Sequence, residues 1–591
     1  MDGPQDAREG AGVEWGAILM LVAVLAAWFG ATGLRELLPA DEGRYAQIAR
    51  EMAASGDWVT VRYNGLKYFE KPPLHFWMGA LAFDVFGVGI WQARLWVATS
   101  SLIGIGALML ACARWWGARF AGTVGLVMMA MPLWVLGGQF NSLDMGVSAA
   151  LAVVLAAFML AHHPATDRIG RRRWMLLAWA AMGVAVLSKG LIGVVLPGLV
   201  LTVYILWSRD WQLVKRLHLL SGLVMFAAIT VPWFWLVSAR NPEFLHFFFI
   251  QEHFQRYTTT MHGRSNPWWY FIPLLAVGSL PWAGLWWAMA RGAARAASGR
   301  DLPIAPAPGP LSGVTPRAGS AQATIPASAP AQAGLAIERL LIAWAGSIFL
   351  FFSASGSKLP GYILPVLPAL AVLAALALER LSERAWRRHL FMACVVALAL
   401  AALSPLVGRM EQPDTPRMHF EALAQWFVAA AAIAAAAAAA AWWLARRSIQ
   451  QSRAAYALGA LTATLVAAVG HNQIGAVTSG VSLAPAVSRV LTEQMPLYGV
   501  RRLDHTLPFA LQHRLIMVET PDELAFGVSR EPERWVPTLA QFLDHWQHGP
   551  RALALMTPAT FNELRDQSIV MEEVARDSRR VVVANFKPAA P

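Results

Sequence analysis

Residues 15–45 read WGAILMLVAVLAAWFGATGLRELLPADEGRY, an apolar segment followed at once by a polar turn. The apolar part, 15–34, has the length of a helix that crosses a bilayer. The turn after it carries two adjacent acids, Asp41 and Glu42, and then Arg44. Ionisable groups at membrane depth are costly, and they are therefore candidates for function. This combination of an apolar segment and a charged turn guides the interpretation of the remaining chain.

The composition is that of an integral membrane protein. The chain has 591 residues, of which 57% are hydrophobic and 14% are charged, whereas soluble domains are about 25% charged. The net charge of +12 is typical of basic cytoplasmic loops, so it does not imply a nucleic-acid partner. The two cysteines, Cys112 and Cys394, are far apart and offer no disulfide framework. The polar start, 1–14, lacks a secretory signal pattern, so the first segment is expected to be a retained anchor.

Hydropathy predicts a helical polytopic fold, because lipid cannot satisfy backbone polar groups and a spanning helix needs about 20 apolar residues. The stretch 74–90 is apolar but short, and we expect it to lie at the membrane interface. About thirteen spans are predicted, at 15–34, 91–112, 119–137, 144–161, 173–187, 190–207, 217–238, 270–291, 337–356, 361–379, 388–408, 420–445 and 454–472.

Arginine and lysine fix the predicted orientation, since they accumulate in cytoplasmic loops. They occur in every second loop, near 114–119, 168–173, 209–216, 291–300, 380–388 and 446–453. The first long loop, 35–90, and the tail should then face outward. This divides the chain into a transmembrane domain, 1–475, and an outer domain, 476–591. Within the first, the Pro/Ala-rich stretch 301–334 is expected to be a disordered cytoplasmic linker.

The tail after residue 476 has an α/β pattern. Short apolar runs at 497–502, 514–519, 551–556 and 580–586 are typical of strands, and helical spacing marks 533–547. Thr557-Pro558 is a favourable helix start. We find no glycine motif for nucleotides in the tail, and we expect no nucleotide cofactor.

The predicted outer loops contain further side chains that can carry chemistry. A histidine in such a loop, His253, is by itself more often structural than a metal ligand. Convergence of carboxylates, cations and a histidine on one face favours a catalytic site instead. The candidates beyond the first turn are Glu70, Lys71, Asp144, Lys189, His253, Arg256, Lys358 and Tyr362.

Each candidate also has a structural alternative. Asp144 could simply favour the N-terminus of its helix. Asp41 could form a local ion pair with Arg44. Lys189 and Lys358 could be interface anchors whose ammonium groups snorkel to the membrane surface.

The chemistry that fits this set is transfer from a lipid carrier. The outer face of a membrane lacks ATP and nucleotide sugars, so a transferase there needs a lipid-linked donor with lipid phosphate as leaving group. Arginine and lysine would stabilise the charge that develops on that phosphate. A carboxylate would orient or deprotonate the acceptor.

The first loop, LLPADEGRYAQIAREMAASGDWVTVRYNGLKYFEKPPLHFW, resembles that of the bacterial aminoarabinose transferases that modify lipid A. These enzymes lie within the GT-C glycosyltransferase family that includes the protein O-mannosyltransferases. The stretches NSLDMG, VLSKG, QEHFQRY and SKLPGYILP support the resemblance, as do the predicted spans and the α/β tail. It covers the whole chain except 301–334. DEGRYA together with YFEKPPL points to the lipid A–modifying branch and its near relatives.

The resemblance implies roles for individual residues. Asp41 matches the essential acid of the first loop, and Asp144 matches a second acid. Residues of the set match positions near the substrate or the carrier phosphate, namely Arg44, Tyr45, Lys71, Lys189, Arg256, Lys358 and Tyr362. Glu70 with His253 resembles a zinc site, to which His471 could add a third ligand.

The implied reaction moves 4-amino-4-deoxy-L-arabinose from undecaprenyl phosphate to a lipid A phosphate. It would take place at the periplasmic face of the bacterial inner membrane and confer resistance to cationic peptides such as polymyxin. We expect membrane lipids as surroundings and a monomeric protein. A related transferase, such as a protein O-mannosyltransferase, is the nearest alternative. A lipid-carrier transporter is an alternative of another class, but the internal repeats and mid-membrane charges typical of transporters are not evident.

Overall fold

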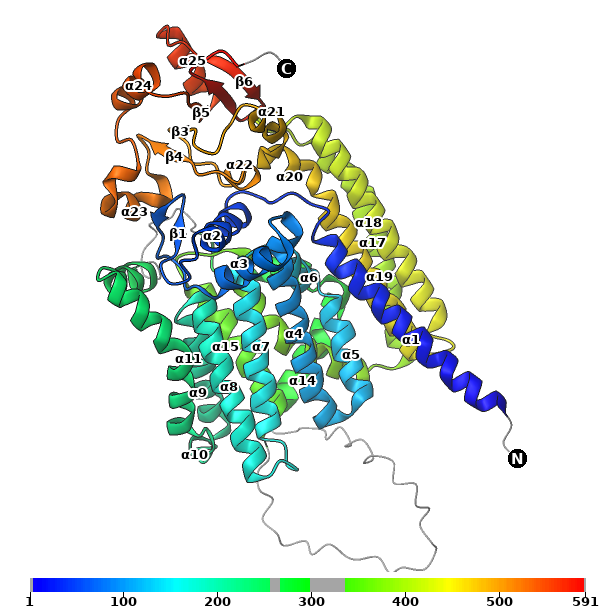
Figure 1. Ribbon diagram of the computed structural model, residues 1–591. Helices are drawn as coiled ribbons and strands as arrows, with labels where there is room; N and C mark the ends of the chain where they lie inside the picture. Colours follow the sequence, from blue (N-terminus) through cyan, green and yellow to red (C-terminus); the bar gives the residue numbers. More distant parts are fainter. Residues whose placement is uncertain (1–3, 256–265, 298–334, 589–591) are drawn as a thin grey trace, which may run out of the picture.

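The structure is a computed structural model that describes residues 4–255, 266–297 and 335–588. A helical body carries a C-terminal α/β domain at one end, and the first long loop lies between the two (Figure 1). The N-terminal end of α1 lies at the opposite end of the molecule from the C-terminus. The predicted linker, 301–334, falls outside the described residues.

Every predicted span coincides with a helix or a bent pair of helices. The helices of the body are α1 (Pro4–Ala31), α4 (Ile90–Trp116), α5 (Ala118–Met129), α6 (Pro132–Gln139), α7 (Leu143–Ala161), α8 (Arg168–Lys189), α9 (Ile192–Ser208), α10 (Leu213–Arg216), α11 (Leu219–Arg240), α13 (Phe271–Gly278), α14 (Trp286–Ala297), α15 (Ile337–Ala354), α16 (Leu367–Glu379), α17 (Glu383–Leu403), α18 (Arg417–Leu444) and α19 (Ile449–Gly470). Short 3₁₀ and π segments join them, namely η1 (His246–Gln255), η2 (Leu280–Leu285), η3 (Pro360–Val366) and η4 (Ser404–Arg409).

The count of thirteen straight spans is not confirmed. Among the described residues, eight helices are long and apolar enough to cross a membrane, or up to ten if each bent pair is one span. The predicted span 119–137 is broken by 69° between α5 and α6, where Pro132 starts a new helix. The predicted span 270–291 is bent by 99° after α13, where Pro281 lies in the first turn of η2. Proline lacks the N–H that a continuous helix would need there.

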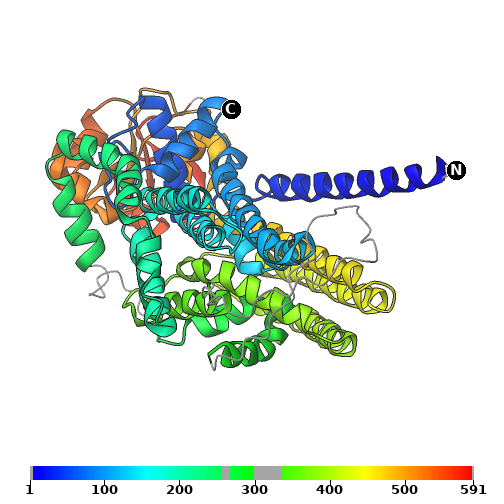
Figure 2. The same ribbon diagram turned by 90° about the horizontal axis from the view of Figure 1, so that it is seen from below.

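The helices form a main body and a side bundle. Helix α7 is almost entirely buried and packs against α4 and α8, so it lies in the middle of the body. Helix α18 packs against both α17 and α19. The C-terminal part of α1 contacts α19, and its N-terminal part extends away from the body (Figures 1 and 2). Arginines near the helix ends pair with carboxylates of neighbouring helices. Arg453 donates to Glu379 at 2.6 Å, and Arg380 pairs with Glu338.

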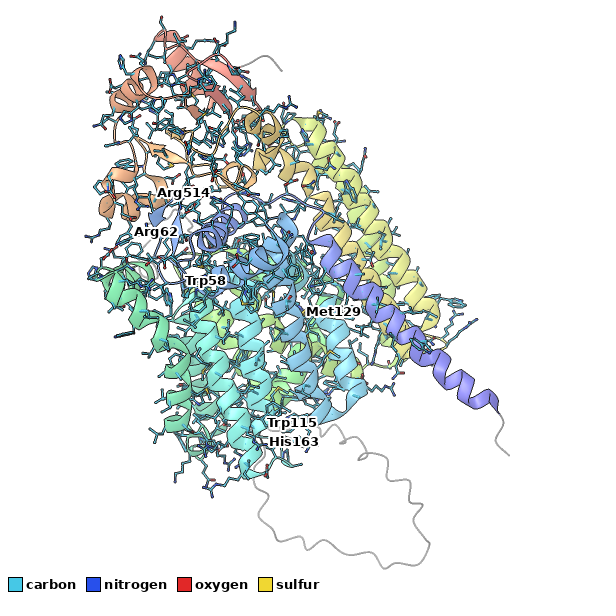
Figure 3. All side chains as sticks on the ribbon, viewed as in Figure 1. Trp58, Arg62, Trp115, Met129, His163 and Arg514 are labelled. Carbon is cyan, nitrogen blue, oxygen red and sulfur yellow. The ribbon has the colours of Figure 1, made fainter. Side chains whose placement is uncertain are left out.

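The first long loop is folded. It contains α2 (Asp41–Ser55), the two-stranded hairpin of β1 (Arg62–Tyr63) and β2 (Leu66–Lys67), and α3 (Leu74–Phe86). Helix α3 confirms that 74–90 contains a short apolar helix. Arg62 and Arg514 lie where this loop meets the C-terminal domain, whereas Trp115 and His163 lie at the opposite end of the body (Figure 3).

The tail is the predicted α/β domain. Its sheet has the order β4-β3-β5-β7-β6, with β3 parallel to β4 and β5, and with β7 antiparallel to β5 and β6. All four predicted strands are present, and β6 was not predicted because its charged sequence, EEVAR, is largely solvent-facing. The elements are α20 (Asn472–Ser479), η5 (Val481–Leu483), α21 (Ala484–Ser488), β3 (Leu497–Val500), α22 (Leu507–Ala510), β4 (Ile516–Val518), η6 (Asp522–Leu524), α23 (Ala525–Arg530), η7 (Pro532–Arg534), α24 (Leu539–His548), β5 (Leu553–Met556), α25 (Pro558–Asp566), β6 (Glu572–Arg576) and β7 (Val581–Ala584).

The alternation of side chains along the strands explains how the domain is seated. Leu497 and Leu553 belong to the apolar cluster that includes Tyr63 of the first loop. Their neighbours Tyr498 and Ala554 point to the other face, where α24 and α25 cover the sheet. Successive residues of a strand face opposite sides, so one face of the sheet packs on the first loop.

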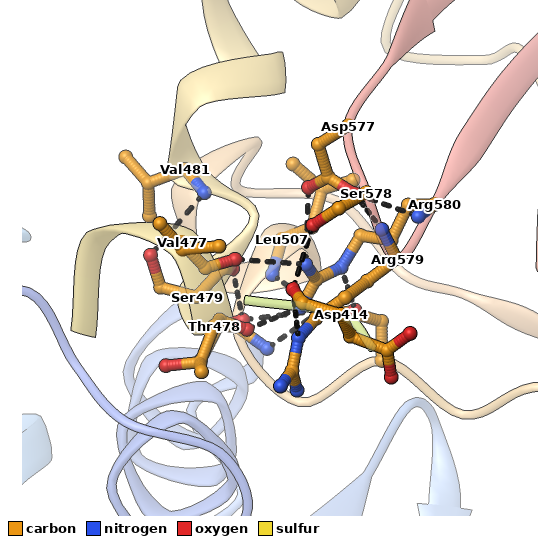
Figure 4. Close-up of polar contacts among 12 residues, drawn as sticks. Asp414, Val477, Thr478, Ser479, Val481, Leu507, Asp577, Ser578, Arg579 and Arg580 are labelled. Carbon is orange, nitrogen blue, oxygen red and sulfur yellow. Dashed lines mark hydrogen bonds and ion pairs between the residues drawn. The ribbon is translucent and has the colours of Figure 1, made fainter. Parts of the chain in front are cut away.

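A buried arginine joins the sheet to the C-terminal end of α20, the short helix that follows α19. Arg580 bonds Asp504 at 2.6 Å and donates to the carbonyls of Val477 and Thr478 at the C-terminal end of α20 (Figure 4). The last carbonyls of a helix have no partner within the helix, and a guanidinium satisfies them well. This contact sets the position of the sheet relative to the helical body.

Candidate active site

Arg44, in the first turn of α2, lies between two carboxylates. One terminal nitrogen donates to Asp41 and the other donates to Glu523 of the C-terminal domain. The local ion pair that was an alternative for Asp41 is therefore present. The Arg44 side chain is 6% exposed, whereas Asp41 is 43% exposed. The Nε of Arg44 is buried and has no hydrogen-bond partner, so the guanidinium keeps donor capacity of the kind that binds phosphate.

The neighbouring Glu42 holds this turn in place. Its buried carboxylate is gripped by Arg35 at 2.6 Å and by Arg94 at 2.8 Å. It also accepts the backbone N–H groups of Leu38 and Asn141 at 3.0 and 2.8 Å. Burial alone would raise the pKa of Glu42, but the two guanidiniums hold it well below its ordinary value. The anion is thus fixed, and with it the start of α2.

Tyr45 connects the predicted acids. It is buried, its ring meets the His75 ring edge-on at 5.5 Å, and the Arg44 guanidinium lies 5.0 Å from its centre. Burial and the charge of Asp41 raise the pKa of Tyr45 well above its ordinary value; Glu70 and Asp144 act in the same direction. Three candidate carboxylates from separate segments therefore act on one phenol.

Asp144 and Lys189 form a second ion pair, at the N-terminus of α7 and the C-terminus of α8. The Lys189 ammonium also lies 4.5 Å from the centre of the Tyr362 ring. A side chain at position 361 would clash, because a Cβ there would lie 2.5 Å from Oδ2 of Asp144. Glycine at 361 thus lets η3 approach Asp144 closely. Of the predicted residues, Lys189 therefore contacts both Asp144 and Tyr362.

The C-terminal domain also contributes to the site. Glu523 is mostly buried; burial raises its pKa to about 7, and Arg44 opposes that shift. Nδ1 of His505 lies 3.5 Å from Glu523 and 3.0 Å from the hydroxyl of Tyr63. Burial, followed by repulsion from Arg44, lowers the pKa of His505 to about 4. His505 is thus neutral at physiological pH.

Two family models match the chain. Residues 13–248 match the dolichyl-phosphate-mannose-protein mannosyltransferase family, and residues 483–585 match the aminoarabinose transferase C-terminal domain. The relatives from Aeromonas salmonicida and Pseudomonas aeruginosa are both undecaprenyl phosphate-alpha-4-amino-4-deoxy-L-arabinose arabinosyl transferases. The Aeromonas salmonicida relative is 32% identical over 63% of both chains. The Pseudomonas aeruginosa relative is 34% identical over 56% of this chain and 54% of its own. These alignments span less than two thirds of the relatives' length.

The likeness to a solved structure covers almost the whole chain. The crystal structure of ArnT from Cupriavidus metallidurans bound to undecaprenyl phosphate shares 45% sequence identity, with a TM-score of 0.88. The match covers 98% of this chain and 99% of that one. The chain belongs to the aminoarabinose transferase family. As a member of that family it is a multi-pass membrane protein.

Three more predicted residues of this aminoarabinose transferase, Glu70, Lys71 and Lys358, bond to groups close to them in the chain. Lys71 follows Glu70 and donates to its carbonyl at 3.0 Å, and Glu70 accepts from the Tyr68 hydroxyl at 3.3 Å. Lys358 is 5% exposed, and its ammonium donates to the Ser355 carbonyl at 2.6 Å. The chain therefore holds Lys358 inside the protein.

The described residues do not test the predicted zinc site, because one of its ligands, His253, has no described side chain. No three His, Cys, Asp or Glu residues lie close enough to share a metal ion in the part of the chain that the structure describes. His471 lies near Arg35 and Glu42, which act on it electrostatically. The side chain of His253 and all of Arg256 fall outside the described part. We derive no step that uses a metal.

Sequence reasoning missed the contribution of the tail. Glu523 and His505 reach the site from a domain that starts more than 400 residues after Asp41 in the chain, and no motif marks them. It also missed the role of Arg35 and Arg94, which grip Glu42. A signal was present for Arg94, since an arginine inside an apolar helix calls for a buried partner.

Proposed function

We propose that the protein transfers 4-amino-4-deoxy-L-arabinose from undecaprenyl phosphate to a phosphate of lipid A. The observation that carries the proposal is the likeness over nearly the whole chain to a structure named for its bound undecaprenyl phosphate. The site geometry supports it, because Arg44 is a buried guanidinium with a free donor beside a partly exposed Asp41. Such a guanidinium suits a phosphate-bearing donor.

The proposed reaction is a displacement at the anomeric carbon of the sugar. A lipid A phosphate oxygen forms the new bond as the bond from that carbon to the carrier's phosphate oxygen breaks, and undecaprenyl phosphate leaves with the electron pair. Arg44 and Lys71 would stabilise the departing phosphate. An acceptor phosphate is already ionised near neutral pH and needs little help from a base. Asp41 and Asp144 would then bind the sugar's ammonium group or orient the cations.

The placement of charge supports a site on the outer face of the inner membrane. Helix α2, which carries Arg44, and the C-terminal domain lie at one end of the helical body, while α10, with Lys215 and Arg216, lies at the other (Figure 1). Basic loops favour the cytoplasmic side, which leaves the periplasmic side for the site. The product would have a masked phosphate and a new amine, so bacteria should bind polymyxin less. We further propose that the protein acts as a monomer.

Zinc binding by Glu70 and His253 remains part of the proposal. Elemental analysis of the purified protein tests it, with wild type compared with Glu70→Gln and His253→Ala. We expect about one zinc ion per chain in the wild type and a loss in both variants. Equal zinc contents in the three proteins would contradict this site.

The function is tested in a strain that lacks its own transferase. We expect the wild-type gene to add aminoarabinose to lipid A, seen by mass spectrometry, and Asp41→Asn to abolish the addition while the protein remains in the membrane. Unmodified lipid A with the wild-type gene would contradict the proposal. The match of residues 13–248 to protein mannosyltransferases favours a protein O-mannosyltransferase as the second candidate. Secreted proteins that carry an added sugar in the same strain would reveal that activity.

A further inference from the structure

The C-terminal domain places the carboxylate of Glu523 on the guanidinium that is proposed to bind the carrier phosphate. Glu523 sits in η6, and its Oε2 accepts from Arg44 Nη1. Its other oxygen, Oε1, is buried and makes no hydrogen bond, and Nδ1 of His505 lies 3.5 Å from it. A buried carboxylate with so few partners is poorly stabilised. Glu523 is therefore a weakly satisfied anion in the middle of the site.

The domain is docked closely against the turn that carries Arg44. The backbone of His505 lies against Gly43, where a Cβ would come within 2.2 Å of the His505 carbonyl oxygen. His505 also bonds Tyr63 of the first loop at 3.0 Å. The contact between Arg44 and Glu523 thus lies within a close interface between the two segments.

Carboxylates outnumber the guanidinium in this cluster. Arg44 carries one positive charge and serves two carboxylates, Asp41 and Glu523. Glu70 and Asp522 add further negative charge that acts on Glu523. A phosphate that approaches Arg44 therefore competes with the two carboxylates already bonded to its terminal nitrogens.

We propose that Glu523 is a positioning residue that occupies Arg44 in place of the carrier's phosphate, and that carrier binding breaks the Arg44–Glu523 ion pair. The inference rests on the proposed function, because it requires a phosphate at Arg44. Of the two carboxylates on Arg44, Glu523 is the one that can be exchanged. Asp41 is three residues from Arg44 on the same helix, whereas Glu523 belongs to a separate domain. After transfer, Glu523 would reclaim Arg44 and help to release undecaprenyl phosphate.

The test measures binding of undecaprenyl phosphate to the purified full-length protein in lipid nanodiscs. The variants are Glu523→Gln, Glu523→Asp and Glu531→Gln. Glu531 is a matched control, because it joins the same two segments through Arg62 at 2.8 Å and the Lys67 N–H at 2.9 Å but does not contact Arg44. Glu523→Asp keeps the charge, and thermal melting of each variant reports on folding.

We expect Glu523→Gln to lower the Kd for undecaprenyl phosphate about tenfold, equivalent to ~1.4 kcal/mol, because the competing anion is gone. Glu523→Asp and Glu531→Gln should stay near the wild-type Kd. In transfer assays Glu523→Gln should show stronger inhibition by added undecaprenyl phosphate.

Two results would overturn the inference while the proposed function stands. They are an unchanged or higher Kd for Glu523→Gln, and an equal decrease for Glu531→Gln. A wild-type protein that transfers no aminoarabinose and binds no carrier would refute the proposed function itself. If Glu523→Gln does not fold, a Kd of Glu523→Asp well below the wild-type value would also overturn the inference.

Discussion

Replacing Glu42 by glutamine should destabilise the protein strongly. The carboxylate accepts two hydrogen bonds from each of Arg35 and Arg94 and one from each of two backbone N–H groups. Both guanidiniums are buried, at 3% and 0% side-chain exposure. Breaking a buried ion pair by removing one partner costs about 3–5 kcal/mol, and here two cations lose their counter-ion. We therefore expect at least that cost for Glu42→Gln.

The measurement is thermal unfolding of the purified protein in detergent, together with a transfer assay. Glu573→Gln is the control, because its ion pair with Arg576 is exposed, with side chains at 42% and 38%, and such pairs contribute about 0–1 kcal/mol. We expect a large decrease in Tm for Glu42→Gln, a small one for the control, and loss of transfer only for Glu42→Gln. Equal melting temperatures of Glu42→Gln and wild type would refute the reasoning.

The same carboxylate predicts how stability depends on pH. The pKa of Glu42 is lower in the folded protein than in the unfolded chain, because the two guanidiniums outweigh the effect of burial. Its contribution is therefore fully present above the unfolded pKa of about 4.3 and is lost as the pH falls towards the folded value. Glu42→Gln should therefore melt at a temperature that changes less between pH 5 and pH 3 than that of the wild type.

Three further predictions concern the site. Gly43→Ala should detach the C-terminal domain from the first loop, because its Cβ would lie 2.2 Å from the His505 carbonyl oxygen. Limited proteolysis should then be faster for Gly43→Ala than for the control Gly56→Ala, whose Cβ would have no atom within 4 Å. Lys189→Met leaves Asp144 without its cation, and we expect at least a hundredfold loss of kcat/KM, with partial rescue by Lys189→Arg. Carrier affinity should fall as the pH rises through about 7, where Glu523 ionises, and Glu523→Gln should abolish that dependence; a retained pH dependence would contradict it.

The sequence predicted the elements well because apolar runs and charge clusters are local signals. Asp41 and Arg44 stand about one helical turn apart, and the ion pair that was an alternative for Asp41 is present. The bend at Pro132 was missed because the apolar run continues through it without a polar residue. Hydropathy measures composition, and two short helices at 69° have the same composition as one straight span.

The site was predicted in part for a similar reason. Convergence of carboxylates and cations on one face was expected from the predicted topology, and in the structure the charges of Asp144 and Glu70 both act on Tyr45. Glu523 was not foreseen, because its approach to Arg44 depends on how the sheet seats on the first loop. That seating is set by tertiary packing between segments hundreds of residues apart, which one sequence does not reveal.

A structure of the protein with bound undecaprenyl phosphate tests the central claim most directly. The account predicts that the phosphate lies within hydrogen-bonding distance of Arg44 and Lys71, close to Asp41, and that Glu523 has moved away from Arg44. A phosphate bound elsewhere, with the Arg44–Glu523 ion pair still intact, would contradict the account.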